Sequence, residues 1–462
     1  MSEDASHESW SGADRPVAGP FGPAGGLRLL GQGPVPPTHL VPTSQTTTPE
    51  PIRPLWAAPL DRAAVYATPV MAMGRVYVAT EADDVYALDA QDGHVLWHAN
   101  VGSPLTDVAT TAGCGNIDPL GITSRPVFDP ATATLYVLGE TSTGGASPTV
   151  HRQLVGFDAS TGKVVRSADA DPTGGGDDPV DLQQRADLAL AGGRVYVGFG
   201  GLFGDCGHYH GWMVGVSESV GPANVEFNVT PGHEGGAVWE PGGPAIDAAG
   251  DLYITTGNRN HPRDPNVKDA ESVVKLSPTL VEEAAFTDPA ATGDGDLGTD
   301  SPTLLPNGTL FAVGKSDIGY VLRQSDLTLV ARIPGVCGSD PVGSNAFDTA
   351  TDTLYVPCRD GGIQEVDLAR NQLGWHHGEV NGSPVLAAGS LWALHYGDGT
   401  LQVLDPATGD VKKAAQVGAV PTFSTPSVAD GLVLVGTTSG VKAFRGRRRG
   451  IGCRGTDARG KP

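Results

Sequence analysis

Residues 85–97, Val-Tyr-Ala-Leu-Asp-Ala-Gln-Asp-Gly-His-Val-Leu-Trp, decide the fold of this chain. They open with a short apolar run, typical of a buried β-strand, which ends on Asp89. Asp92 and Gly93 then form a pair typical of a tight turn, because glycine adopts positive φ without steric cost. A second apolar run ends on Trp97. We therefore predict two consecutive strands joined by a short turn.

The same pattern recurs between residues 55 and 445 in about eight degenerate copies. In most copies a Pro-apolar pair and a Gly-x-apolar-Tyr-apolar segment come first, so each copy holds three strand candidates and a fourth after the turn. One four-stranded sheet per repeat, arranged radially, predicts an all-β fold, an eight-bladed β-propeller of four-stranded antiparallel blades. The copies span residues 68–97, 126–162, 189–216, 243–276, 302–322, 346–375, 384–409 and 426–444.

The last copy ends at Phe444 without a fourth strand. Residues 54–57, which include Trp56, have the apolar-Trp character of the fourth strand in the first copy. We predict that they complete the last blade, so that N-terminal and C-terminal strands pair and close the ring. Closure would remove two free sheet edges.

Composition and charge predict the ends of the folded region and argue against some classes of partner. Residues 1–54 are a Pro/Gly/Thr-rich leader and residues 446–462 a basic tail, and both are predicted to be disordered. The net charge of −22 argues against nucleic acid as a partner. No apolar stretch is long enough to cross a bilayer, and residues 1–26 show no signal peptide. We expect a monomer.

The motif apolar-x-Ala/Gly-Leu/Phe-Asp-x-x-Thr/Asp-Gly-x-Val/Leu-x-Trp resembles the repeat of the pyrroloquinoline-quinone (PQQ) quinoprotein family. Residues 88–97 are a near-complete instance, whereas residues 157–165 lack the tryptophan. The resemblance covers roughly residues 55–445 and implies a propeller. That family holds both quinone-dependent dehydrogenases and scaffold proteins without a cofactor, so the fold alone does not fix the function.

Four residues resemble the site of the dehydrogenase branch, which uses PQQ and calcium. Asn258, in a Thr-Thr-Gly-Asn turn, and Asp205 are implied as calcium ligands, which suits the preference of calcium for oxygen. Asp296, in an acidic loop, is implied as the catalytic base, and Lys315 as the residue that contacts the quinone. A carboxylate would take the proton of an alcohol while the quinone accepts hydride.

The chain also departs from the dehydrogenase pattern. It has no adjacent cysteine pair, Asp205 stands where those enzymes have glutamate, and no tryptophan is identifiable as the one that stacks on PQQ. Asn258 and Asp296 also suit ordinary turns, and Lys315 suits a blade edge. We therefore favour a binding or scaffold module for a protein or small-molecule partner at the propeller face. The alternative is a PQQ- and calcium-dependent dehydrogenase that oxidises alcohols or sugars.

Two features indicate where any activity lies and in which compartment. Copies three to five carry the longest insertions, and insertions in propellers project from one face. Cys337 and Cys358 flank a short loop and strand, and Cys114 and Cys206 lie in corresponding loops of neighbouring copies. Two disulfides would imply an extracytoplasmic, oxidising compartment. Reduced thiols in the cytoplasm are the alternative.

Overall fold

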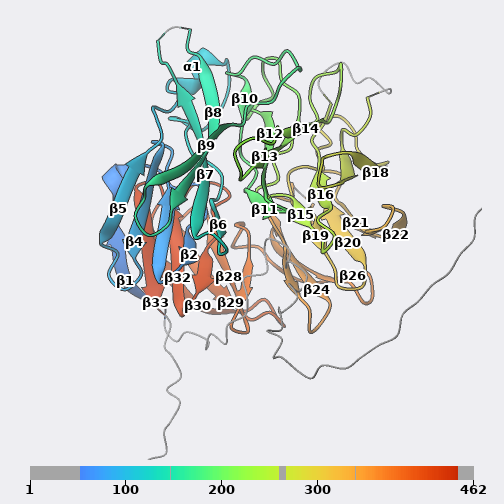
Figure 1. Cartoon of the computed structure of the whole chain (residues 1–462). Helices are drawn as coiled ribbons and strands as arrows, with labels where there is room; N and C mark the ends of the chain where they lie inside the picture. Colours follow the sequence, from blue (N-terminus) through green and yellow to red (C-terminus); the bar gives the residue numbers. More distant parts are fainter. Residues whose placement is uncertain (1–51, 146, 260–266, 339, 446–462) are drawn as a thin grey trace, which may run out of the picture. The chain divides into compact units, whose positions relative to one another are not determined.

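The computed structural model describes residues 52–145, 147–259, 267–338 and 340–445. The predicted tail at 446–462 and all but the last three residues of the predicted leader lie outside the described residues. The fold is built from eight antiparallel sheets, named blades 1 to 8 from here on (Figure 1). This confirms the predicted all-β, eight-bladed propeller.

The four strands of each blade follow one another in chain order, except in blade 8. Blade 1 contains β2 (Val70–Ala72), β3 (Arg75–Ala79), β4 (Asp84–Asp89) and β5 (Val95–Asn100), and blade 2 contains β6 (Val127–Asp129), β7 (Thr134–Ser142), β8 (Val150–Asp158) and β9 (Val164–Asp169). Blade 3 contains β11 (Ala189–Ala191), β12 (Arg194–Gly201), β13 (Trp212–Ser217) and β14 (Val225–Asn228), with the extra strand β10 (Leu182–Gln183) on β12. Blade 4 contains β15 (Ala245–Ile246), β16 (Leu252–Thr255), β17 (Ser272–Leu276) and β18 (Glu282–Thr287).

Blade 5 contains β19 (Thr303–Leu304), β20 (Thr309–Val313), β21 (Ile318–Arg323) and β22 (Leu329–Pro334), and blade 6 contains β23 (Ala346–Asp348), β24 (Thr353–Cys358), β25 (Gly362–Asp367) and β26 (Gln372–His377). Blade 7 contains β27 (Val385–Ala387), β28 (Ser390–His395), β29 (Thr400–Leu404) and β30 (Val411–Gln416). Blade 8 contains β31 (Ser427–Ala429), β32 (Leu432–Thr437), β33 (Gly440–Arg445) and β1 (Arg53–Ala58). Within the described ranges, helix is limited to η1 (Leu60–Arg62) and α1 (Val108–Thr111), and no helix there is long and apolar enough to span a membrane.

The ring closes as predicted. Strand β1 pairs antiparallel with β33, and Trp56 lies opposite Ala443. The first strands of blades 1 to 5 contact one another in succession, as do those of blades 6 to 8, and β31 of blade 8 contacts β2 of blade 1. A bridge between Asp300 and Gly343 joins the segments that enter blades 5 and 6.

The tryptophan and glycine of the repeat motif dock neighbouring blades on one another. The Trp97 indole of blade 1 donates to the Ala159 carbonyl of blade 2 at 3.0 Å. Gly162 of blade 2 has φ +72°, and a Cβ there would lie 2.6 Å from the Trp97 ring. Only glycine meets both demands. The same docking joins Trp56 to Gly93 and Trp375 to Gly409.

The tyrosine of the motif also joins neighbouring blades, through its hydroxyl group. The Tyr77 hydroxyl of blade 1 donates to the Ala159 carbonyl of blade 2 at 3.0 Å. Tyr355 of blade 6 donates to the Pro406 carbonyl of blade 7 at 3.1 Å. The hydrophobic clusters likewise combine residues of adjacent blades, so the core lies between the sheets. The repeat motif therefore encodes the contacts between blades as well as the strands.

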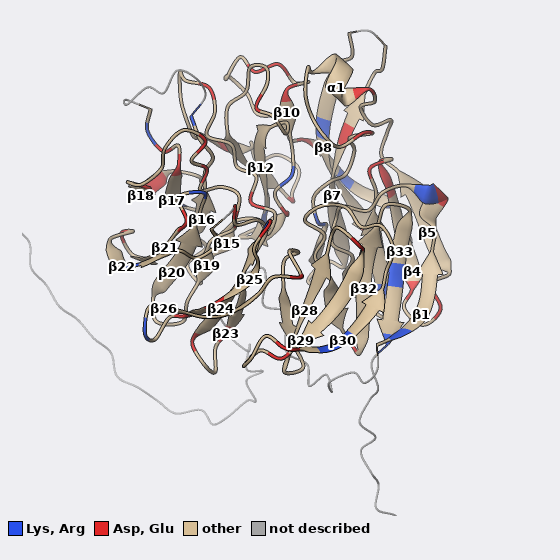
Figure 2. Ribbon diagram, turned by 180° about the vertical axis from the view of Figure 1, so that it is seen from behind, with Lys and Arg blue, Asp and Glu red and all other residues tan. Residues whose placement is uncertain are grey.

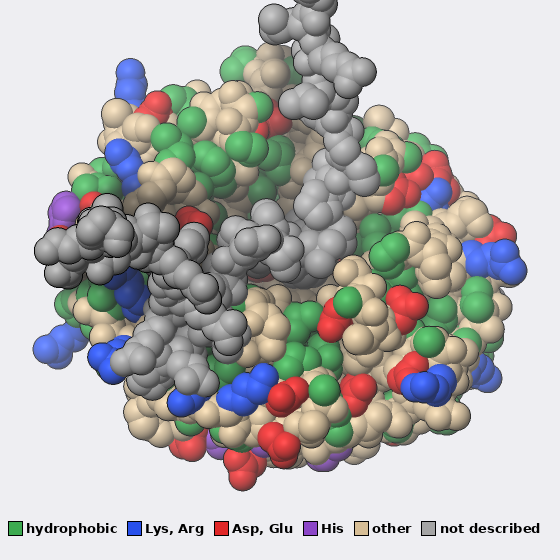
Figure 3. Space-filling view, turned by 90° about the horizontal axis from the view of Figure 1, so that it is seen from below, with side chains coloured by type: hydrophobic (Ala, Val, Ile, Leu, Met, Phe, Trp, Pro, Cys, Tyr) green, Lys and Arg blue, Asp and Glu red, His purple; other side chains and the backbone are tan. Residues whose placement is uncertain are grey.

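The antiparallel order divides the loops between two ends of the propeller. One end, named the connection end here, carries the loops that follow the second strand of each blade and the connections between blades. The opposite end carries the tight turns. Many of the Asp and Glu residues lie in loops and turns (Figure 2). From below, the surface not covered by grey atoms mixes hydrophobic, acidic and basic side chains (Figure 3).

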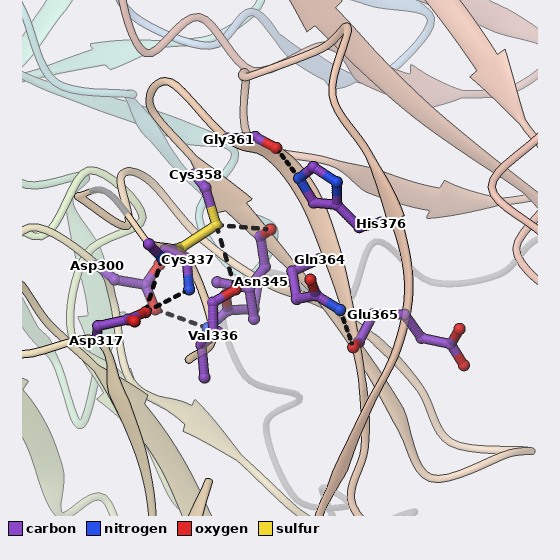
Figure 4. The surroundings of a disulfide bond; sticks show 12 residues. Asp300, Asp317, Val336, Cys337, Asn345, Cys358, Gly361, Gln364, Glu365 and His376 are labelled. Atoms are coloured by element: carbon purple, nitrogen blue, oxygen red, sulfur yellow. Dashed lines mark hydrogen bonds between the residues drawn. A yellow bond between two sulfur atoms is a disulfide. The ribbon is translucent and has the colours of Figure 1, made fainter. Parts of the chain in front are cut away.

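Both predicted disulfides are formed, and both lie at the connection end. Cys114–Cys206 has a Cα–Cα distance of 6.1 Å and joins the β5–β6 connection to the β12–β13 loop. The expectation that these two loops hold the same position in neighbouring repeats is wrong, because the first connects blades 1 and 2 and the second lies within blade 3. Cys337–Cys358 links the β22–β23 connection to the end of β24 (Figure 4). The Asp317 carboxylate accepts the Cys337 N–H at 2.6 Å beside this disulfide.

Candidate active site at blades 4 and 5

Three of the four predicted site residues meet at the connection end of blades 4 and 5. Asn258 comes three residues after β16, Lys315 two residues after β20, and Asp296 lies in the connection between these blades. Strands β16 and β20 are the second strands of adjacent blades, so they end side by side. The Lys315 N–H donates to the Asp296 carbonyl at 2.8 Å and fixes the two loops together.

The side chains form a compact polar cluster. The Lys315 Nζ lies 2.6 Å from Asp296 Oδ2 and 2.7 Å from Asp294 Oδ1. The Asn258 backbone N–H donates to Asp296 Oδ1 at 2.5 Å, and its side-chain amide donates to Asp294 Oδ1 at 3.2 Å. Asp296 is 1% exposed and Asp294 is 66% exposed. One acid is therefore enclosed and the other faces solvent.

Burial dominates the electrostatics of Asp296. It raises the pKa of this carboxyl to about 7, against the lowering effects of the Lys315 ammonium and the Asn258 N–H. The pKa of Lys315 is raised, because Asp296 and Asp294 outweigh the opposing effect of burial. The pKa of Asp294 is lowered, because the bond from Lys315 outweighs burial. Asp296 is thus a carboxyl that can exchange a proton near neutral pH.

Asp205, the fourth predicted residue, contacts a buried tyrosine. It lies in the β12–β13 loop and accepts the Tyr209 hydroxyl at 2.6 Å. Burial raises the pKa of Tyr209, with further contributions from the charges of Asp205, Asp296 and Asp294. Gly235 N donates to the Tyr209 carbonyl at 3.0 Å, which holds this loop beside blade 4.

Trp239 was not identified from the sequence. It lies in the connection that enters blade 4, is half-buried, and donates its indole N–H to the Gly201 carbonyl at 2.8 Å. A Cβ at Gly257 would lie 3.1 Å from the Trp239 ring and 2.9 Å from Asp296 Oδ1. The glycine of the predicted Thr-Thr-Gly-Asn turn therefore lets the indole and the buried carboxylate approach the same point. The insertion that carries Trp239 has no fixed place in the repeat pattern.

The oxygen atoms of the cluster are already engaged. Asp296 holds Lys315 and the Asn258 N–H, and one Asp205 oxygen holds Tyr209. A calcium ion requires six to eight oxygen ligands, so the arrangement suits the lysine ammonium better than calcium. In the described part of the chain, three potential ligand groups come close together at Asp89, Asp92 and His94, in an exposed turn at the opposite end of blade 1.

Comparisons with known proteins agree with the architecture. Residues 48–197 match the family model described as outer membrane protein assembly factor BamB. No curated protein matches the sequence of the chain. Quinohemoprotein alcohol dehydrogenase from Comamonas testosteroni is similar in structure, with a TM-score of 0.62, 17% identity and coverage of 86% of this chain and 77% of that chain.

Two further solved structures extend the range of functions. BamB from Moraxella catarrhalis has a TM-score of 0.58 and 13% identity, and the match covers 86% of this chain and 100% of that chain. A europium-containing methanol dehydrogenase has a TM-score of 0.62 and 15% identity, with coverage of 87% and 92%. In fold the chain therefore resembles PQQ-like β-propeller repeat proteins, and the family model covers its first part, residues 48–197. Identities this low establish the fold but leave the activity open.

Proposed function

We propose that the cluster of Asp296, Lys315 and Asn258 is the active centre of a dehydrogenase that works with a quinone. The observation that supports this most strongly is the enclosed Asp296, whose pKa of about 7 suits a general base. A purely structural propeller does not need an almost fully buried carboxylate with a lysine at 2.6 Å. Burying such a pair is costly, and perturbed pKa values gather at functional sites.

Each residue has a distinct task in this proposal. Asp296, in its ionised form, accepts the hydroxyl proton of an alcohol. The Asn258 N–H holds Oδ1, so that the carboxylate keeps one orientation. The Lys315 ammonium binds Asp296 and offers its remaining donor capacity to an anionic oxygen of the cofactor. The quinone, when bound, supplies the hydride acceptor.

The surroundings fit a planar quinone with acidic groups. Trp239 presents an indole beside Asp296 and Gly257, and Lys315 presents a positive charge. Flat aromatic molecules stack on such rings. Calcium fits less well for the reason given above, and no step of this proposal depends on it.

A scaffold role is the second candidate, and one observation favours it. The match to BamB from Moraxella catarrhalis covers 100% of that chain, whereas the match to the Comamonas testosteroni dehydrogenase covers 77%. A scaffold would bind a protein partner at a propeller face. It would not bind PQQ or reduce a dye in the presence of an alcohol.

We also propose an extracytoplasmic location. The structure contains Cys114–Cys206 and Cys337–Cys358, and disulfides persist mainly in oxidising compartments. Mass mapping of the protein purified from its native host under non-reducing conditions tests this. Free thiols at all four positions would contradict it.

Reconstitution tests the dehydrogenase proposal. The purified chain is titrated with PQQ, with and without calcium, while visible absorbance and alcohol- or sugar-dependent dye reduction are followed. We expect saturable binding and dye reduction. Lys315→Met should weaken PQQ binding, whereas Lys412→Met, which removes a lysine paired with Asp405 in blade 7, should not. No absorbance change and no dye reduction with any alcohol or sugar would contradict the dehydrogenase proposal and leave the scaffold role as the remaining candidate.

A further inference from the structure

An arginine and a phenylalanine from distant blades meet inside the ring. The Arg185 guanidinium carbon lies 3.8 Å from the centroid of the Phe423 ring. Arg185 precedes the first strand of blade 3, and Phe423 precedes the first strand of blade 8. These blades are not neighbours, so the two side chains approach each other across the inside of the propeller. Both residues lie at the connection end.

The guanidinium of Arg185 has no hydrogen-bond acceptor among the residues that the structure describes. It is half-buried, and burial lowers the pKa of Arg185 to about 10, so it remains charged at neutral pH. The ring of Phe423 covers its face, while the five N–H donors project from its edge. A partly buried cation without an acceptor is costly, so this edge is suited to an external anion.

Glu81, whose charge acts on Arg185, is a second group with an unsatisfied atom. It is 1% exposed, and its Oε2 accepts the Gly121 N–H at 2.9 Å and the Thr123 hydroxyl at 3.1 Å. Its Oε1 has no partner in the described structure. Burial raises the pKa of Glu81 to about 8, so at neutral pH it carries a proton and cannot neutralise Arg185.

Tyrosines and a second arginine surround the pair. The charges of Glu81 and Arg185 both act on Tyr66, and the Tyr396 ring lies 6.3 Å from the Phe423 ring. Arg359, which pairs with Asp340 at 3.2 Å, lies 5.9 Å from the Phe423 ring. The charge of Arg359 also acts on Asp294 of the Asp296–Lys315 cluster.

We infer that Arg185, Phe423 and Glu81 form a binding site for the carboxylate group of a small organic molecule. A carboxylate is planar and accepts two parallel hydrogen bonds from a guanidinium edge. The protonated Glu81 offers a further donor, and Phe423 and the tyrosines contact the organic part. This rests on the proposed function in one respect only, because it names carboxylate-bearing molecules as the substrates presented to Asp296. Binding itself requires neither quinone nor turnover.

Calorimetric titration of the full chain with benzoate tests this site. We expect saturable benzoate binding that weakens tenfold or more in Arg185→Gln and in Arg185→Lys, because lysine keeps the charge but loses the paired donors. Arg332→Gln is the matched control, because Arg332 lies 5.5 Å from the ring of Tyr320 in blade 5. Circular dichroism checks that each variant is folded.

The outcomes separate this inference from the dehydrogenase proposal. Asp326→Asn, at an exposed turn of blade 5, should bind benzoate as the wild type does. The titration is run without PQQ, so a failed PQQ assay leaves the carboxylate site intact. The inference is overturned if benzoate does not bind, or if Arg185→Gln and Arg185→Lys bind it normally. It is also overturned if inorganic phosphate binds more tightly than benzoate, or if PQQ displaces benzoate, which would assign Arg185 to the cofactor.

Discussion

At the scale of single residues, Asp296 combines near-complete burial with a pKa raised to about 7, so its protonation state controls what the site can do. The resemblance to the quinoprotein repeat indicates Asn258, Asp296 and Lys315, and they lie together because they follow second strands or lie in the acidic loop between two repeats. Arg185 and Trp239 lie in connections of variable length. Arg185 meets Phe423 of a distant blade, whereas Trp239 meets Gly201 and Gly257 of neighbouring blades, and no local pattern encodes either meeting.

The pH dependence of the reaction is a residue-level prediction. If Asp296 is the base, kcat/KM for dye reduction should rise as pH increases through about 7, because only the ionised carboxylate accepts a proton. Asp294 raises the pKa of Asp296, so Asp294→Asn should move the rise to lower pH. The profile of Asp326→Asn, at an exposed turn of blade 5, should match the wild type. A profile that does not move in Asp294→Asn contradicts this assignment.

At the scale of elements, the docking of one blade on the next follows from the repeat motif. The strands, the tight turns and the closing role of Trp56 could be predicted because alternation and turn chemistry act locally. The packing partner of the motif's tryptophan could not be predicted in this way, because the indole packs on the glycine of the following blade.

Alanine substitutions at two matched glycines test how much this docking contributes to stability. Gly162 and Gly74 have φ +72° and +71°, so alanine is strained at both by about 1 kcal/mol. At Gly74 nothing lies within 4 Å of the added Cβ, whereas at Gly162 the Trp97 ring lies at 2.6 Å. Denaturant unfolding should therefore show Gly162→Ala to be less stable than Gly74→Ala by about 1–3 kcal/mol. Equal losses would mean that the docking adds nothing.

At the scale of the whole molecule, buried acids link stability to pH. Burial raises the pKa of Glu81 and of Asp83 to about 8, with Glu140 contributing in both cases. The folded state therefore holds protons that the unfolded chain releases above its ordinary carboxyl pKa values. The stability from these groups is complete at acidic pH and is lost as pH rises from about 4 to about 8.

The midpoint temperature of thermal unfolding should accordingly decrease as pH is raised from 5 to 8. Asp83→Asn is expected to flatten this slope, because an amide has no proton to lose. Asp326→Asn, at an exposed turn, should keep the slope of the wild type. A midpoint that rises steadily over the interval in the wild type would show that these acids are ionised in the folded protein.

If Asp296 is the base of a quinone-dependent reaction at blades 4 and 5, its loss must slow the reduction of the quinone itself. A single-turnover experiment measures this step: the chain loaded with PQQ is mixed with an alcohol, and the loss of quinone absorbance is timed. We expect Asp296→Asn to bind PQQ but to reduce it about 100-fold or more slowly than the wild type. Reduction at the wild-type rate in Asp296→Asn would contradict it.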